Sequence, residues 1–486
     1  MKVAAGLVVL LPLLGAAASV WARGRMQALV GTFSAGATVL AAIALIAEVW
    51  RSGATTVLRL AGPANLEVVL IADGLGTAMV VMTSVTGGFV SAFAVVDHLH
   101  DPTARHRAYW PVWLTLWGCL HLLFLAGDLL TVYLMFEAVG VAGVALVVLG
   151  GDRRTVLAGT RYLYAELVAT TTVLIGIAVV WHQTGTLVLA ELGPALTASP
   201  SGWWALGMIT AGLLIKVPLA PLHFWLPAAH ALAPSAVSPV LSAVVVKSAF
   251  VVLVRLWFLT VPTLVTRGAA QLLGWLGVVA IAWGSLAALR AIEVKRLIAY
   301  STVAQLGFLF LLPPLFEGGA GDAWSGGILY AIAHAFAKAA MLMAAAVLVE
   351  DARRPQIVAL TGAATRRPVA VFAIGVAALS LVGLPPSGGF VAQWYLLVAS
   401  FETGQWWWLA PIVVGSLMTA AYLMRLLKPA LAAPEDGSTA SMSTTGDGRE
   451  WIALALAATT VVLGLRPTEL LELIGVGAPS TLLGGG

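Results

Sequence analysis

The chain has 486 residues, of which 60% are hydrophobic and only 10% are charged, and its formal net charge is +4. Soluble globular domains carry about 25% charged residues, so this composition excludes a soluble protein, and the small positive charge does not indicate nucleic-acid binding. The apolar runs are about 20 residues long and do not alternate, which predicts membrane-spanning helices rather than the strands of a barrel.

The apolar runs predict about fourteen transmembrane helices in an all-α polytopic membrane protein. The first run imitates a signal peptide, but Arg23 and Arg25 follow it, which favours an uncleaved helix with its N-terminus outside. The predicted helices cover residues 3–21, 28–50, 71–95, 108–127, 129–150, 158–181, 204–231, 236–260, 268–290, 294–314, 324–349, 368–400, 406–427 and 451–465.

These helices are predicted to form a three-helix segment followed by two inverted five-helix repeats, with one broken helix in each repeat. Residues 51–68 are expected to form an outer hairpin, and the hydrophilic stretch 429–450 is rich in small and polar residues, which indicates a flexible loop. The predicted boundaries are 1–107 for the N-terminal segment, 108–260 and 268–428 for the two repeats, 429–450 for the cytoplasmic loop, and 451–486 for the last helix and tail.

The basic residues of the loops predict the orientation in the membrane. Most of them fall on one side of the predicted helices, and cytoplasmic loops carry the excess of Lys and Arg. The other side holds only Lys2, Arg51, Arg59, Arg267 and Arg466. The pattern predicts a multi-pass protein of the bacterial inner membrane with both termini outside.

Three lysines lie near the middle of apolar runs, where an ionisable group is costly and normally faces a protein interior or a water path. They are Lys216, Lys247 and Lys338. Arg255 also lies in such a run, but close to its end, so its long side chain is expected to snorkel to the interface.

Three acids accompany these lysines. Asp128 and Glu137 are nine residues apart, about 13 Å along one helix, so Asp128 can reach the interface while Glu137 lies near the middle. Glu137 cannot stay charged there without a partner, and Lys216 is the partner we expect. Glu166, in the next predicted helix, is a secondary candidate that fits a structural role as well as a role in the pathway.

Prolines break two of the predicted helices. Pro218 and Pro221 closely follow Lys216, and Pro385 and Pro386 interrupt a later run. Proline removes a backbone donor and kinks or ends a helix, and a break at membrane depth is tolerated only beside protein or water. Transporters use such breaks at ion sites.

Three histidines are further candidates. His334 and Lys338 are four residues apart and share a helix face, while the secondary candidates His223 and His230 are seven apart and are expected to lie roughly on one face. No acid or cysteine stands near them at ligand spacing, so no metal site is predicted. Structural ion pairs, or polar groups that hold helices together, remain the alternative to a proton path.

Four segments resemble those of one known family. They are LLIKVPLAPLHFWLPAAHALAPSAVSPVLSAVVVK (213–247), VKRLIAYSTVAQLG (294–307), AHAFAKAAM (333–341) and LVGLPPSGGFVAQW (381–394). In this order they resemble the antiporter-like subunits of respiratory complex I and of Mrp-type sodium/proton antiporters, and the length is most similar to the D-type member of the Mrp antiporters. The resemblance implies a proton channel whose path residues here are Glu137, Lys216, Lys247, His334 and Lys338.

Gln393 departs from the family pattern, because the resemblance implies a lysine or a glutamate at this position of the second broken helix. A glutamine cannot take up or release a proton near neutral pH. The outer part of the path is therefore either rerouted, for example through Lys338, or closed.

The resulting hypothesis is a proton-translocating subunit of a multisubunit membrane complex, either an Mrp-type cation/proton antiporter or a complex I-like NADH-quinone oxidoreductase, with sodium left open as a second ion. The chain shows no glycine-rich nucleotide loop, and Cys119 is its single cysteine, so no cofactor and no catalysis by this chain alone are expected. Other membrane subunits and the lipid bilayer are the expected partners, and no nucleic acid is.

The alternative hypothesis is a non-conducting scaffold or coupling subunit. Such a subunit would keep the fold and energise, for example, a soluble partner for inorganic carbon uptake, as the resemblance implies for related membrane subunits. Gln393 is the residue that supports this alternative.

Overall fold

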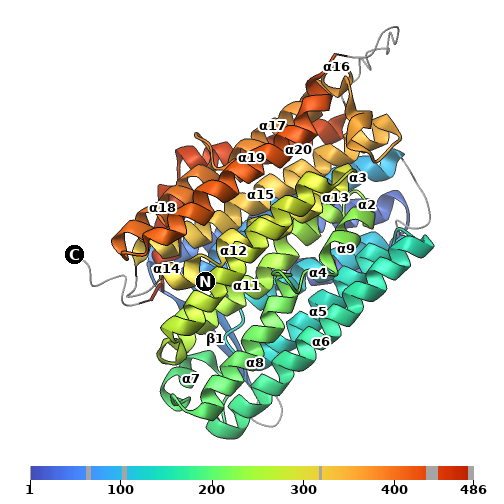
Figure 1. Ribbon diagram of the computed structural model, residues 1–486. Helices are drawn as coiled ribbons and strands as arrows, with labels where there is room; N and C mark the ends of the chain where they lie inside the picture. The colour runs from blue at the N-terminus through green and yellow to red at the C-terminus, as the bar shows by residue number, and fades with distance from the viewer. Residues whose placement is uncertain (1, 62–66, 101–106, 317–319, 434–446, 480–486) are drawn as a thin grey trace.

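The computed structural model describes residues 2–61, 67–100, 107–316, 320–433 and 447–479. Within these ranges the chain is a bundle of long helices that run side by side (Figure 1). Eleven of the described helices are long and apolar enough to cross a membrane. The predicted all-α polytopic membrane architecture is confirmed, whereas the count of fourteen spans and the inverted repeats stay predictions.

The N-terminal part contains three long helices and one hairpin, whose two strands are antiparallel with Thr56 opposite Ala72. The hairpin predicted within 51–68 is present, although its second strand continues beyond that range and residues 62–66 lie outside the described part. The elements are α1 (Lys2–Trp21), α2 (Arg25–Ser52), β1 (Thr56–Ala61), β2 (Glu67–Ala72) and α3 (Gly74–His100).

The next part begins with three helices and ends with a helix that contains two π-helical segments. Its elements are α4 (Tyr109–Phe124), α5 (Leu129–Val148), α6 (Arg153–Thr184), α7 (Leu189–Ala195), α8 (Pro200–Lys216), α9 (Leu226–Leu232), α10 (Ser238–Val240), η3 (Leu241–Val245), α11 (Val246–Val254), η4 (Arg255–Thr260) and η5 (Pro262–Leu264). From α10 to η4 the chain is one continuous span, Ser238–Thr260.

The last part starts with two helices that pack closely, since a Cβ at Gly284 would meet the backbone of Ala304. Its elements are α12 (Arg267–Arg290), α13 (Val294–Leu309), α14 (Leu312–Leu315), α15 (Gly321–Ala352), η7 (Ile357–Leu360), α16 (Ala363–Arg366), α17 (Pro368–Val382), α18 (Gly388–Glu402), η8 (Trp406–Trp408), α19 (Leu409–Leu431), α20 (Gly448–Leu465) and α21 (Thr468–Gly475). Most of the loop predicted at 429–450 lies outside the described residues.

Both predicted helix breaks are present. α8 ends at Lys216 and α9 begins at Leu226, and the break between them is held by Trp225, whose indole Nε1 donates to the carbonyl of Ile215 at 3.0 Å. α17 ends at Val382 and α18 begins at Gly388, with the two prolines between them. Proline sterics and the missing N–H groups explain both positions.

The core of the bundle is formed by three spans. Every residue in the most apolar window of Ser238–Thr260 is buried, as are 94% of those in Val294–Leu315 and Gly321–Ala352. By contrast, less than half of the corresponding windows of α2, α6 and α12 is buried. The buried spans are the ones that carry Lys247, His334 and Lys338, so these ionisable groups lie at the centre of the protein.

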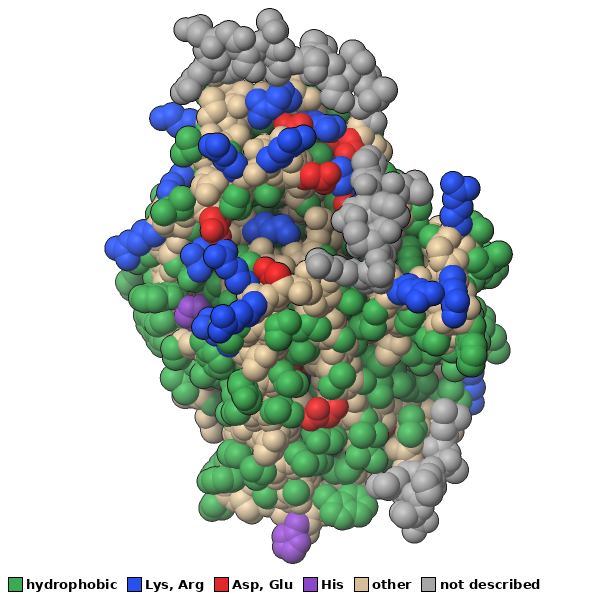
Figure 2. Space-filling model, turned by 90° about the vertical axis from the view of Figure 1, so that its right-hand side faces the viewer, with side chains coloured by type: hydrophobic (Ala, Val, Ile, Leu, Met, Phe, Trp, Pro, Cys, Tyr) green, Lys and Arg blue, Asp and Glu red, His purple; other side chains and the backbone are tan. Residues whose placement is uncertain are grey.

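One end of the bundle carries most of the basic side chains, and we refer to it as the arginine-rich end. Figure 2 shows Lys and Arg side chains gathered over the upper part of that view, around a hollow, with hydrophobic side chains below. Ion pairs join three helices at this end. The guanidinium of Arg449 on α20 pairs with the carboxylates of Asp97 on α3 and Glu350 on α15, both at 2.7 Å. Arg367 pairs with Asp351 and Glu450.

Candidate proton path

The first broken helix carries a buried ion pair. Lys216, the last residue of α8, is paired with the Glu166 carboxylate of α6, and the side chains are 5% and 9% exposed. Gly212 explains how the two helices come so close, since a Cβ there would meet the backbone carbonyl of Ala169. Gly212 lies one turn before Lys216, and Ala169 lies about one turn after Glu166, so the close contact sets the pair face to face.

Glu137 is not the partner of Lys216, so the predicted Glu137–Lys216 pair is wrong in this structure. Its neighbour Phe136 faces the lysine instead, with the ammonium 4.9 Å from the ring centroid. Gly140, one turn further, lies against the Glu166 carboxylate, because a Cβ there would be 2.7 Å from its Oε2. Glu137 is only partly buried and points to the edge of that face, beside Tyr133.

Lys247 lies at the centre of the bundle with no exposed surface. Its ammonium donates to the carbonyl of Ser242, which belongs to the π-helical segment η3. A π-helical turn disrupts the regular backbone hydrogen bonds and often marks a functional site. The Ser242 hydroxyl hydrogen-bonds Thr302 on α13 at 2.9 Å, so this segment is joined directly to the second half of the protein.

Lys338 binds α13 beside Thr302. Its ammonium donates to the hydroxyl of Ser301 and, at 3.1 Å, to the carbonyl of Ile298. Ser301 and Thr302 are consecutive residues, so Lys247, through Ser242, and Lys338 both reach one turn of α13. These hydroxyls were not predicted from the sequence, because serine and threonine give no distinctive signal within an apolar helix.

Two buried histidines lie among these lysines. His334 is one turn before Lys338 on α15, and His230 of α9 is within electrostatic range of Lys247, Lys338 and Lys295. Neither histidine ring has a hydrogen-bond partner at either nitrogen within the described part of the chain. Buried polar groups in proteins are nearly always satisfied, by ordered water where protein groups are absent. His230, a secondary candidate from the sequence, therefore belongs to the central group.

Beyond Lys338 the hydrogen-bond network is built from neutral side chains. Gln305 on α13 donates to Thr419 at 3.0 Å and to Tyr422 at 3.2 Å, and it accepts from Tyr330. Gln393 on α18 accepts from Ser416 at 2.9 Å, and its amide lies against Gly383 in the second break. The amide nitrogen of Gln393 is buried without a partner among the described residues.

The sequence-based expectations for Asp128, His223 and Arg255 are also wrong. Asp128 does not reach the interface: it is buried and caps α5, accepting from the Thr131 N–H at 2.7 Å and from the Val69 N–H at 2.9 Å. His223 and His230 do not share a helix face, because His223 lies in the break before α9. Its ring contacts Trp283, at 6.4 Å between centroids.

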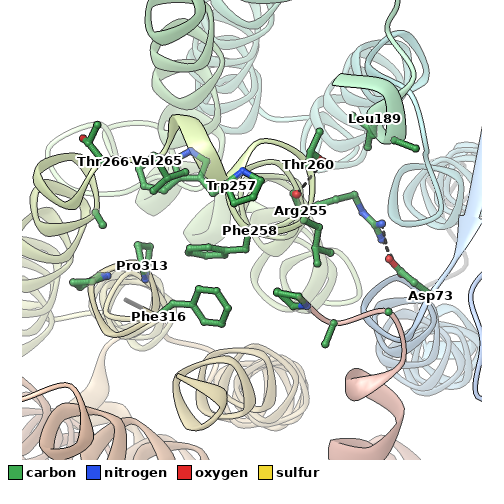
Figure 3. Close-up of a pocket in the computed structure, with 18 of the residues that line it drawn as sticks. Asp73, Leu189, Arg255, Trp257, Phe258, Thr260, Val265, Thr266, Pro313 and Phe316 are labelled. Atoms are coloured by element: carbon green, nitrogen blue, oxygen red, sulfur yellow. Dashed lines mark hydrogen bonds and ion pairs between the residues drawn. The ribbon is translucent and has the colours of Figure 1, made fainter. Parts of the chain in front are cut away.

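Arg255 does not snorkel. Its guanidinium is buried and forms two hydrogen bonds to Asp73, at 2.6 and 3.0 Å. This pair lines a cavity of about 750 Å³ at the end opposite to the arginine-rich end, and Figure 3 shows Asp73 and Arg255 across from Phe258 and Phe316. A bidentate pair satisfies both charges without reaching the interface.

Comparisons with known proteins agree with this architecture. Residues 126–419 match the family described as NADH:quinone oxidoreductase/Mrp antiporter, TM. The NADH-quinone oxidoreductase subunit N of Desulforudis audaxviator is 30% identical over 450 residues, which are 90% of this chain and 88% of that protein. Subunit N of Cereibacter sphaeroides is 32% identical over 471 residues, covering 96% and 97% of the two chains.

Solved structures show the same fold. A chain of the Mrp complex from Dietzia sp. DQ12-45-1b superposes with a TM-score of 0.86 at 26% identity, covering 99% of this chain and 98% of that one. A chain of respiratory complex I from Thermus thermophilus with bound NADH gives a TM-score of 0.83 at 22% identity, with 99% and 100% coverage.

Proposed function

We propose a function for this chain from the fact that it belongs to the NADH:quinone oxidoreductase/Mrp antiporter family of membrane subunits. The proposed function is to carry protons through the buried ionisable groups described above. Its relatives are subunits of multisubunit membrane complexes, and we infer that this chain works in such a complex too. The observation that supports the proposal most strongly is the burial of six ionisable side chains inside the bundle: Glu166, Lys216, His230, Lys247, His334 and Lys338.

The chemistry of these side chains suits proton transfer. A lysine without a full carboxylate partner in a buried site loses its proton more easily, because burial disfavours the charged form. Lys216 has the Glu166 carboxylate as its partner, whereas Lys247 and Lys338 are held by carbonyl and hydroxyl groups. A movement that separates Glu166 from Lys216 would therefore release a proton from Lys216 towards Lys247.

The ring nitrogens of His230 and His334, which have no hydrogen-bond partner among the described residues, support the presence of water inside the bundle. Water at these nitrogens would supply the hydrogen-bonded steps between lysines that do not touch each other. Protons are proposed to come in near the first break, on the arginine-rich side, which the positive-inside rule assigns to the cytoplasm. With this orientation both termini lie outside. Sodium remains a second ion that a cation/proton antiporter would carry.

Glu137 is proposed to act beside the pair rather than within it. It lies one turn from Gly140, which touches the Glu166 carboxylate, and it is the partly exposed acid of this region. An ionisable side chain on the outside of a membrane bundle needs a protein or water environment. We propose that a neighbouring subunit covers Glu137 and that a charge change there disturbs the Glu166–Lys216 pair.

The experiment is proton flux into sealed vesicles that contain the intact complex with a Lys216→Ala chain. The control is Lys428→Ala, which removes an exposed lysine from α19. Loss of flux in the first variant, with assembly and the control unaffected, supports the proposal. Unchanged flux in an assembled Lys216→Ala complex contradicts it.

The neutral network around Gln305 and Gln393 favours a second candidate function, a non-conducting coupling subunit. A complex whose wild-type chain passes no protons, but which gains flux with Gln393→Lys, would establish this alternative. A wild-type flux that disappears with Lys216→Ala would rule it out.

A further inference from the structure

A groove at the arginine-rich end lies between the last turn of α12 and the first turn of α13. It encloses about 530 Å³, and Arg290, Glu293, Arg296 and Gln356 line it together with the aromatic side chains of Trp283 and Tyr300. A second hollow of about 540 Å³, lined by Arg354 and Val358 among others, shares Gln356 with it. The two hollows therefore lie next to each other at Gln356.

The floor of this groove is fixed by backbone hydrogen bonds. The Val294 N–H donates to the carbonyl of Pro355, and the Ile357 N–H donates to the carbonyl of Ile292, both at 2.9 Å. These bonds hold the loop after α15 against the start of α13. The arginines at the start of α13 and in the loop after α15 are therefore held in fixed positions relative to each other.

The groove carries an unbalanced positive charge. Arg290, Arg296 and Arg354 are exposed, and within the described ranges none of the three forms an ion pair. Among the residues that the structure describes, Glu293 is the one carboxylate that lines the groove. The neighbouring arginines at this end differ, since Arg366, Arg367 and Arg449 are all paired with carboxylates. A surplus of guanidinium groups in a fixed groove fits an anion, above all a phosphate, which arginine binds in a bidentate manner.

The surroundings of the groove are apolar and exposed. Trp283 is 55% exposed, Ile292 is 68% exposed and Val358 is 76% exposed. Along α12, Val279 and Leu286 are exposed on the same helix. Tryptophan prefers the level of the membrane at which the headgroups begin, and basic pockets between transmembrane helices on the cytoplasmic side bind anionic headgroups. The arginines thus stand where an apolar membrane surface meets its headgroup layer.

We propose that this groove binds the headgroup of an anionic phospholipid, with Arg290 and Arg296 on the phosphate and the acyl chains along the exposed face of α12. The proposal requires the arginine-rich end to lie at a membrane surface, but it does not require protons to pass through the chain. The indole of Trp283 also contacts His223 in the first helix break. The bound lipid therefore lies one aromatic ring away from the segment that follows Lys216.

The test uses the assembled complex in vesicles of phosphatidylcholine that contain a photoactivatable phosphatidylglycerol or, in a parallel sample, a photoactivatable phosphatidylcholine. Crosslinked peptides are mapped by mass spectrometry. We expect the anionic probe to label residues 283–296 and 354–358 well above the neutral probe. The double variant Arg290→Gln/Arg296→Gln should lower that excess about tenfold, since each charge-assisted hydrogen bond is strong. Arg153→Gln/Arg154→Gln, an exposed basic pair at the start of α6, is the control and should leave it unchanged.

Equal labelling by the two probes in the wild-type complex would overturn the proposal, as would a fully assembled double variant that keeps the excess. Competition on the wild-type complex gives a readout that does not depend on the variant. Unlabelled phosphatidylglycerol should suppress the labelling, whereas unlabelled phosphatidylcholine should not. Equal suppression by phosphatidylglycerol and by the same concentration of inorganic phosphate would indicate a site for a free anion and would contradict a site specific for a lipid.

Discussion

Lys216 at the end of α8 is paired with Glu166 of α6, and both side chains are buried. The close approach of the two helices at Gly212 places this pair directly before the break of the seventh predicted helix. The acid that pairs with Lys216 is therefore on α6, and the more exposed acid Glu137 is on α5.

Glu166→Gln is expected to impair transport more than Glu137→Gln. The glutamine leaves the buried ammonium of Lys216 without a counter-charge, and breaking a buried pair in this way costs about 3–5 kcal/mol. We expect proton flux to fall by about a hundredfold, within the range for loss of a proton-transferring group. Flux per assembled complex is the measurement, and a Glu137→Gln complex that is the more impaired of the two would contradict the ranking.

Gly140→Ala tests the position of the Glu166 carboxylate without removing a charge. The new methyl group would lie 2.7 Å from Oε2, so the carboxylate has to move away from its place beside Lys216. We expect a reduced flux, smaller in effect than that of Glu166→Gln. Gly207→Ala on α8 is the matched control, because a Cβ there has no neighbour within 4 Å. Equal flux in both variants would show that the exact carboxylate position does not matter.

Thr302→Val tests the hydroxyl contact between the two halves. The substitution keeps the shape of the side chain but removes the hydrogen bond to Ser242, whose carbonyl holds Lys247. We expect the flux to fall several-fold and the complex to lose about 1 kcal/mol of stability. The control is Thr172→Val on α6, whose hydroxyl bonds only its own helix, at Val168. A flux equal to that of the control would show that the Ser242–Thr302 hydrogen bond is not needed for proton transfer.

Asp128→Ala is expected to affect stability and not transport. The substitution removes the cap of α5 and leaves the Val69 N–H without its partner, which costs about 1–3 kcal/mol. Thermal unfolding of the complex should shift to lower temperature, more than for Asp152→Ala, which removes the exposed cap of α6. Loss of flux in a fully assembled Asp128→Ala complex would contradict this expectation and would indicate that Asp128 takes part in proton transfer.

The features that follow from local chemistry could be predicted from the sequence. Long apolar runs indicated the membrane helices, and the prolines after Lys216 and before Ser387 indicated the two breaks. Both effects act within a few residues of the chain, so neighbouring helices do not change them.

The partner of Lys216 could not be predicted in the same way. Glu137 and Glu166 are both in the middle of a helix, and the choice between them depends on how α5 and α6 are rotated against α8. One signal was present: Glu166 lies in a stripe with Tyr162, Thr170 and Val173 at helical spacing, all of them buried. On α5, Gly140 and Gly143 mark the close-packed face, and Glu137 lies at its edge, only partly buried.

Asp128 and Arg255 were misjudged for a related reason. Their sequence position near a helix end suggested contact with the interface, but each has a partner from a distant segment, Val69 for Asp128 and Asp73 for Arg255. Such pairs depend on the fold of the N-terminal part, which no local pattern shows.

The central claim is that protons cross the protein through the buried ionisable groups of its two halves, with Lys247 at the junction. The most direct measurement is proton flux in sealed vesicles with the intact complex carrying Lys247→Met, which keeps the length of the side chain but removes its charge, next to Lys428→Met as the control. We predict loss of flux in the Lys247→Met complex and normal flux in the control. Normal flux through an assembled Lys247→Met complex would contradict the claim.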